Sequence, residues 1–134
     1  MRTFSWPVRV YIEDTDAGGV VFYANYLKYM ERARTEHLRT LGFELNDWQD
    51  QERRLFVVRS VEVQYHKPAL FNDELSVHAT IRNVKRASLM CHQPVYRGDE
   101  LMVDALVQLA CIDADSFSPV AMPVAMHEAF RREQ

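Results

Sequence analysis

The sequence predicts an α+β fold in which one long helix lies across a five-stranded antiparallel sheet. Apolar residues recur at helical spacing over only one long segment, 22–41. Five other segments alternate apolar and polar residues, as half-buried strands do. Short connections join the last four strands, which favours an antiparallel meander. A lone amphipathic helix needs a large apolar partner, and the sheet supplies one.

The first half of the chain supplies one strand, a loop and the helix. Segment 8–13 alternates, with Val8, Val10 and Ile12 on one face. The loop that follows is Asp14-Thr15-Asp16-Ala17-Gly18-Gly19. The apolar stripe of segment 22–41 comprises Tyr23, Leu27, Met30, Leu38 and Leu41, and Gly42 is expected to end the helix. Segment 45–53 is polar apart from Trp48, so we expect a short surface helix or a loop.

The second half supplies four strands and a short terminal helix. Segment 55–65 places Arg59 on the same face as Val57 and Val61, so we expect Arg59 at a pocket mouth rather than in open solvent. Segments 75–81, 89–95 and 101–111 also alternate. Pro94 cannot donate to a ladder, which predicts an edge or a bulge in the second of these. Segment 125–132 is expected to be helical.

Length and composition narrow the class of protein. The 134 residues fit one domain, 1–134, and 48% hydrophobic residues can form its core. A net charge of −3 and the absence of a basic arm argue against nucleic-acid binding. The sequence shows neither a signal peptide nor an apolar run long enough to enter a membrane, so we expect a cytoplasmic protein. Cys91 and Cys111 are expected to be small buried hydrophobes.

The loop before the helix carries the groups that a hydrolytic site needs. Asp14 and Asp16 are two residues apart, and Gly18 and Gly19 allow close approach of a ligand. The helix that follows begins with N–H groups that lack intrahelical partners and can hold a developing oxyanion. A carboxylate there can act as nucleophile or general base. The alternative is purely structural, because Asp and Gly also form turns and cap helices.

Other catalytic equipment is missing from the sequence. No GxSxG elbow, phosphate-binding loop, GxGxxG or HExxH motif occurs, and the five histidines lack metal-ligand spacing. An EF-hand starting at Asp14 is rejected, because its fifth position needs an oxygen-bearing side chain and is Gly18, and its twelfth position needs Glu and is Asn25. We therefore predict no metal and no cofactor. Hydrolysis would depend on a carboxylate and backbone dipoles, which suits an activated ester such as a thioester.

Two ordered motifs identify a family. The first is Arg9-Val10-x4-Thr15-Asp16-x2-Gly19-Val20-Val21-Phe22, followed by Tyr26 and Glu31-Arg32-Ala33-Arg34. The second is Val61-x-Val63-x-Tyr65-x-x-Pro68-Ala69, followed by Asp73-x-Leu75. Both resemble the 4-hydroxybenzoyl-CoA thioesterase family of hotdog proteins. Within it, Glu13-Asp14-Thr15-Asp16-Ala17-Gly18-Gly19-Val20-Val21 and Phe56-Val57-Val58-Arg59 resemble the YbgC-type thioesterases associated with the bacterial Tol-Pal system.

This resemblance implies a hotdog fold, dimers with a continuous sheet that commonly pair into tetramers, and active sites at subunit interfaces. Asp16 matches the catalytic carboxylate of the family, which selects it over Asp14. Tyr23 matches the first helical N–H, which polarises the thioester carbonyl. Only the backbone of Tyr23 is carried over, because many YbgC-type members have His there. Gly19 is expected beside the substrate.

Recognition of CoA is expected to involve basic side chains. Lys85 and Arg86 lie in the turn where related enzymes hold the nucleotide phosphates, although a solvated basic turn is the simpler explanation. Arg59 is a further candidate for substrate binding. Arg34 lies near the centre of the apolar helix face and needs a partner, for which we expect an acid of the same or a neighbouring subunit.

The leading hypothesis is hydrolysis of a small acyl-CoA thioester, with acyl carrier protein as an alternative carrier. Asp16 attacks the carbonyl or activates a water, while the Tyr23 N–H holds the carbonyl oxygen. One rival is a hotdog hydratase or dehydratase, which would use a His–acid pair, but residues 1–36 contain no His. The other rival is a non-catalytic acyl-binding or scaffolding protein of envelope lipid metabolism.

Overall fold

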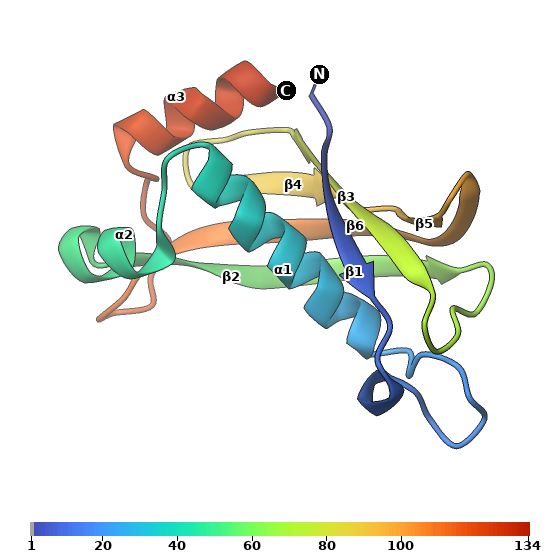
Figure 1. Cartoon of the computed structure of the whole chain (residues 1–134). Coiled ribbons are helices and arrows are strands. Elements are labelled where there is room, and N and C mark those ends of the chain that lie inside the picture. Colours follow the sequence, from blue (N-terminus) through green and yellow to red (C-terminus); the bar gives the residue numbers. More distant parts are fainter. Residues whose placement is uncertain (1) are drawn as a thin grey trace.

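One long helix crosses one face of an antiparallel sheet, and two shorter helices lie near its C-terminal end (Figure 1). The computed structural model describes residues 2–134. Its elements are β1 (Phe4–Arg9), the 3₁₀-helix η1 (Ile12–Asp14), α1 (Asn25–Thr40), α2 (Leu45–Glu52), β2 (Arg54–Tyr65), β3 (Glu74–Arg82), β4 (Ser88–His92), β5 (Val95–Arg97), β6 (Glu100–Asp113) and α3 (Val124–Glu133). The predicted α+β architecture is confirmed.

The sheet differs from the prediction in strand number and strand order. It has six strands, because the expected strand 89–95 is divided into β4 and β5 at Gln93 and Pro94. The order is β1-β3-β4-β6-β2, with β5 pairing β3 and β6. The last four predicted strands are therefore not a meander: β2 pairs with β6 at the far edge, not with β3. Pairing between distant segments decides this order, and local patterns do not encode it.

The first strand and the long helix both have boundaries that differ from those predicted. β1 lies at Phe4–Arg9, where Pro7 is tolerated because the strand is at a sheet edge. The chain then turns into η1, because the Asp14 carboxylate accepts a hydrogen bond from the Tyr11 N–H at 2.8 Å. Ile12, predicted to share the face of Val8, is consequently exposed.

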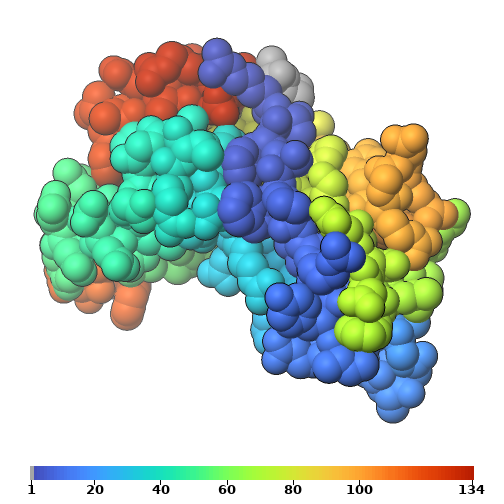
Figure 2. All heavy atoms as spheres, in the orientation of Figure 1, coloured from blue at the N-terminus to red at the C-terminus, as the bar shows by residue number. Residues whose placement is uncertain are grey.

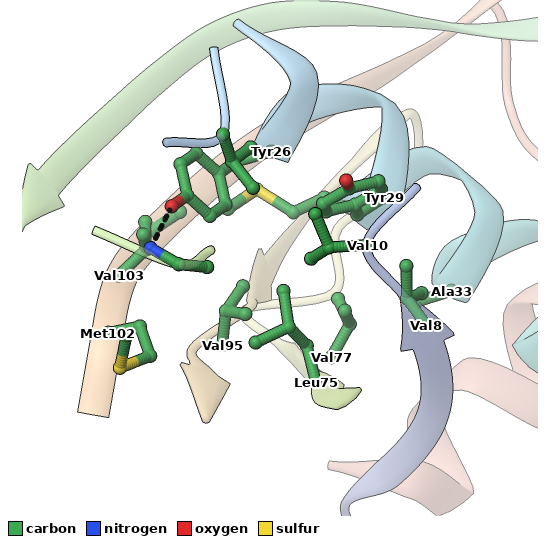
Figure 3. Close-up of a cluster of buried hydrophobic side chains, with 14 residues drawn as sticks. Val8, Val10, Tyr26, Tyr29, Ala33, Leu75, Val77, Val95, Met102 and Val103 are labelled. Carbon is green, nitrogen blue, oxygen red and sulfur yellow. Dashed lines mark hydrogen bonds between the residues drawn. The ribbon is translucent and has the colours of Figure 1, made fainter. Parts of the chain in front are cut away.

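The buried face of α1 is also displaced from the predicted stripe. Tyr23 and Leu27 are exposed, whereas the buried helix residues are Tyr26, Tyr29, Met30, Ala33 and His37. The first four of these pack with the core strands in a cluster shown in Figure 3, where the Tyr26 hydroxyl accepts a hydrogen bond from the Ala69 N–H at 3.1 Å. The helix ends as predicted: Gly42 follows it with φ +95°.

A β-bulge in β2 overturns the expected position of Arg59. Val58 pairs with Leu109 and Ser60 pairs with Gln108, so Arg59 is the extra residue of the strand. The bulge reverses the alternation, so Val57 does not share the face of Val61. Arg59 is exposed rather than set in a pocket mouth.

Two expectations on shorter features are confirmed. The helix α2 lies within segment 45–53, and segment 125–132 lies within the helix α3. Cys91 and Cys111 are buried free thiols, and burial raises the pKa of Cys91 to about 12. Within residues 2–134, no helix is both long and apolar enough to cross a membrane.

Candidate active site

The segment 14–22, called here the aspartate loop, projects from the sheet beside the start of α1 (Figure 1). It folds back on itself, because Thr15 bridges Val21 and the Asp16 N–H donates to the Val20 carbonyl oxygen at 2.9 Å. The Gly18 N–H donates to Asp16 Oδ1 at 2.8 Å. The side chain of Asp16 is exposed, and its Oδ2 accepts no hydrogen bond from the described residues. One carboxylate oxygen is thus oriented and the other is available.

Glycine is needed at two places in this loop for different reasons. Gly19 has φ +82°, which other residues rarely adopt. A Cβ on Gly18 would lie 3.3 Å from Asp16 Oδ1. Gly18 therefore leaves room for the Asp16 carboxylate, and Gly19 allows the turn.

Asp14 has a structural role in the same loop. Its carboxylate caps the Tyr11 N–H, and its carbonyl oxygen accepts from the Phe22 N–H at 2.9 Å and from Asn25 Nδ2 at 2.8 Å. Burial, and secondarily the Asp14 carboxylate, raise the pKa of the neighbouring Tyr29 phenol. Asp14 thereby ties the loop to the start of α1 and leaves Asp16 as the outward-facing acid.

We expect Asn25→Ala to lower the free energy of unfolding by about 1 kcal/mol, because it removes the partly buried bond to the Asp14 carbonyl. Urea denaturation measures the change. The Lys28→Ala substitution, on an exposed site of the same helix, is the control and should alter stability little. Equal stabilities for Asn25→Ala and the parent would contradict this role.

Tyr23 lies before the helix rather than in its first turn. α1 begins at Asn25, whose N–H donates to the Phe22 carbonyl oxygen at 2.8 Å. Among residues 2–134, no acceptor meets the N–H of Tyr23. Its carbonyl oxygen is held by the Tyr65 hydroxyl at 3.1 Å. The aspartate loop therefore leads directly to a backbone N–H that is free to donate, but this N–H belongs to the turn before α1 and not to the first turn of the helix, where it was predicted.

A pocket of about 220 Å³ lies between α1 and the sheet. Its apolar walls are Phe56, Val58, Ile81, Leu89, Leu109 and Phe130. From α1 it receives Glu31, Arg34, Thr35 and Leu38, which lie on one helix face. In Figure 2 the surface is hollowed along α1, between α2 and the aspartate loop. Sequence reasoning missed this pocket, because its walls come from seven separate elements.

Within the chain, the partner of Arg34 is an amide and not an acid. Arg34 Nη1 donates to Gln93 Oε1 at 2.8 Å, and Gln93 Nε2 donates to the Met30 carbonyl oxygen at 2.9 Å. Burial lowers the pKa of Arg34. The signal for Gln93 was present in the sequence as the one strongly polar residue on the core face of segment 89–95.

The expected CoA-binding residues are far from Asp16 in the same chain. Lys85 and Arg86 are exposed in the turn after β3, whereas Val20 of the aspartate loop bridges Leu70, just before β3 begins. The nine residues of β3 separate these two places by about 26 Å. One chain thus brings Asp16, Gly19 and Tyr23 together, but not Arg59, Lys85 or Arg86.

Comparisons with known proteins agree with this architecture. The family model of the thioesterase superfamily matches residues 18–105, beginning just after Asp16. The acyl-CoA thioesterase YbgC of Haemophilus influenzae is 42% identical over 95% of this chain and 93% of its own. The acyl-CoA thioester hydrolase YbgC of Escherichia coli O6:H1 is 40% identical over 96% of each.

A solved structure supports the same grouping. A probable thioesterase from Bartonella henselae superposes with a TM-score of 0.87 at 32% identity, covering 91% of this chain and all of that one. The expected hotdog fold is therefore confirmed. From its sequence, its fold and these relatives, the chain belongs to the thioesterase superfamily.

Proposed function

We propose that this protein is an acyl-CoA thioesterase whose carboxylate is Asp16 and whose oxyanion-binding group is the Tyr23 N–H. The observation that supports this proposal is the geometry of the aspartate loop, where the Asp16 carboxylate has one oxygen without a hydrogen bond and the chain then continues to the free Tyr23 N–H. Named relatives at 40–42% identity supply the substrate class. A thioester is reactive enough to be hydrolysed with the help of one carboxylate and one backbone N–H.

The proposed reaction places the thioester carbonyl oxygen against the Tyr23 N–H. Asp16 then attacks the carbonyl carbon, or removes a proton from a water that attacks it. If Asp16 attacks, the carbon–sulfur bond breaks to leave a mixed anhydride on Asp16 and the CoA thiolate, and a water then hydrolyses the anhydride, which restores the carboxylate and supplies the proton that the thiolate takes up. If Asp16 acts as a base, the water that loses its proton attacks the carbonyl carbon, the carbon–sulfur bond breaks, and the thiolate takes up that proton. In both routes the water oxygen ends in the carboxylic acid. Gly19 leaves the approach open, because no side chain extends from it.

A second copy of the chain completes the site in this proposal. β2 is a twelve-residue strand at the open edge of the sheet, and an exposed edge is a template for pairing. Tyr65, which holds Tyr23, lies at one end of β2, while Phe56 and Val58 of the pocket lie toward the other. Antiparallel pairing of two β2 strands reverses one against the other. It carries the partner's Tyr23 toward this pocket.

The pocket is proposed to hold the acyl group. A cavity of about 150 Å³ with apolar walls accepts benzene, so about 220 Å³ suits a short or medium acyl chain or an aromatic ring. The same pairing brings the partner's Asp16 toward the end of the sheet that carries Lys85 and Arg86. We propose that these two side chains bind the CoA phosphates, with Arg59 on the pairing strand as a further contact.

Subunit complementation tests this composite site. Asp16→Asn removes the carboxylate, and Thr35→Trp obstructs the pocket from α1. Each variant alone should be nearly inactive. When the two variants are refolded together in equal amounts, half of the dimers contain one chain of each. Each mixed dimer has one intact site out of two, so about a quarter of the parent thiol release should return. Sedimentation checks that both variants keep the parent mass.

A mixture no more active than its components would show that each site lies within one chain.

Replacing acyl-CoA by the same acyl group on acyl carrier protein tests the carrier. We expect the Lys85→Ala and Arg86→Ala variants to lose their preference for acyl-CoA over acyl carrier protein, because these side chains are proposed to bind the nucleotide phosphates and not the acyl group.

A further inference from the structure

We propose that Phe130 of α3 is the end wall of the acyl pocket and sets the longest acyl chain that the enzyme accepts. The buried pair of His37 and Glu133 positions that wall. The inference rests on the proposed function, because it assigns the acyl group to the pocket beneath α1. It concerns a part of the chain outside the two recognised motifs.

The pocket has an open side and a closed side. Val58 on edge strand β2 is 48% exposed, and Glu31 is exposed on α1. Ile81, His37 and Phe130 are only 3–4% exposed. Ile81 lies on β3, three strands in from β2, which corresponds to a depth of about 14 Å. An acyl chain that enters at the β2 edge therefore ends against Ile81 and Phe130.

Phe130 reaches the pocket from α3, which packs against both the sheet and α1. α3 packs against the C-terminal half of α1 (Figure 2). Its buried face consists of Met126, Ala129, Phe130 and Glu133. The Phe130 ring lies 6.0 Å from the Phe56 ring of β2, so the two aromatic side chains together close the side of the pocket that faces α3. A small displacement of α3 would change the depth available to a ligand.

Glu133 fixes the last turn of α3. It lies one helical turn after Phe130, and its Oε1 forms a hydrogen bond with His37 Nε2 at 2.9 Å, both side chains being buried. Arg2 adds two contacts, from its N–H to the Glu133 carbonyl oxygen at 2.9 Å and from Nη1 to Oε2 at 3.3 Å. The Phe4 ring stacks on His37 with centroids 4.9 Å apart.

This arrangement makes Glu133 a positioning residue. A buried carboxylate that loses its partners is costly, so the last turn of α3 stays where those partners are. Phe130 is held by the same turn. The pair acts on substrate length only through the position of the Phe130 ring.

The test is a panel of acyl-CoA substrates from acetyl to dodecanoyl, with kcat/KM measured for each. Phe130→Ala should raise the ratio of dodecanoyl to hexanoyl turnover by about tenfold, because the longer chain gains room. Phe130→Trp should lower that ratio by a similar factor. Met126→Ala, which removes a buried side chain of the same helix that does not line the pocket, should reduce stability without changing the ratio.

The pair has its own readout. Glu133→Ala should shift the ratio in the same direction as Phe130→Ala, while Glu133→Gln, which keeps a carbonyl oxygen for His37, should restore the parent profile. A purely structural role would lower all substrates together. A Glu133→Ala variant that keeps the parent's length ratio would exclude the positioning role.

Failure of this inference and failure of the proposed function are distinguishable. Unchanged length ratios in both Phe130 variants, with thiol release intact, overturn the end wall and leave the thioesterase standing. Absence of thiol release in the parent rejects the function itself. Binding of free octanoic and dodecanoic acid, measured by calorimetry, then decides the wall: Phe130→Ala should bind the longer acid more tightly than the parent does, and equal affinities overturn it.

Discussion

Asp16→Asn should leave the fold intact and reduce acyl-CoA turnover by about two to four orders of magnitude, as loss of a general base or nucleophile does. The amide retains an oxygen for the Gly18 N–H, so the turn around position 16 should persist. It can neither attack a carbonyl nor accept a proton from water. Release of free thiol from acyl-CoA measures the effect, and circular dichroism checks the fold.

Asp14→Asn is the matched control, two residues away in the same loop. Asn can still accept the Tyr11 N–H, and the carbonyl oxygen that holds Phe22 and Asn25 is unchanged. Turnover should therefore remain within about threefold of the parent, since no reacting group is lost. Parent-like turnover in Asp16→Asn, or a greater loss in Asp14→Asn, would assign the chemistry to a different residue.

Gln93→Leu should lower the free energy of unfolding by about 3 kcal/mol, because it leaves a partly buried guanidinium without its amide partner. Gln93 is fully buried, and its amide joins Arg34 to the Met30 carbonyl oxygen. Leu has a similar size but no polar group. Urea denaturation at one fixed protein concentration measures the loss, since self-association would change apparent stability.

The double variant Arg34→Met with Gln93→Leu separates the missing bond from a packing defect. Removing both polar partners eliminates the partly buried unpaired charge, so most of the stability should return. If the double variant is less stable than Gln93→Leu alone, altered packing around position 93 causes most of the loss. A loss below about 1 kcal/mol in the single variant would mean that water replaces the amide.

Several features of the molecule follow from local sequence alone. The period of segment 22–41 predicted the long helix, and Gly42 predicted its end, because only backbone freedom is needed at φ +95°. Pro94 predicted an edge or a bulge in segment 89–95, and the structure has a break between β4 and β5 there. The family resemblance selected Asp16 and Tyr23 as site residues, and Gly19 lies between them in the same eight-residue segment.

Other features required the folded chain. The start of α1 moved to Asn25, since the Asp14 carbonyl oxygen binds the Phe22 N–H and Asn25 side chain. The bulge at Arg59 and the pairing of β2 with β6 depend on residues about fifty positions away. No pattern within segment 55–65 predicts either the bulge or the pairing.

The sequence by itself determined the element types, the aspartate loop and the family, since each depends on residues that are neighbours along the chain. Only the tertiary structure decided the order of the strands, the amide partner of Arg34 and the pocket that Phe130 closes. Those features arise where helices and strands distant in sequence pack together. The free energy of that packing belongs to pairs of segments, and no single segment carries its signal.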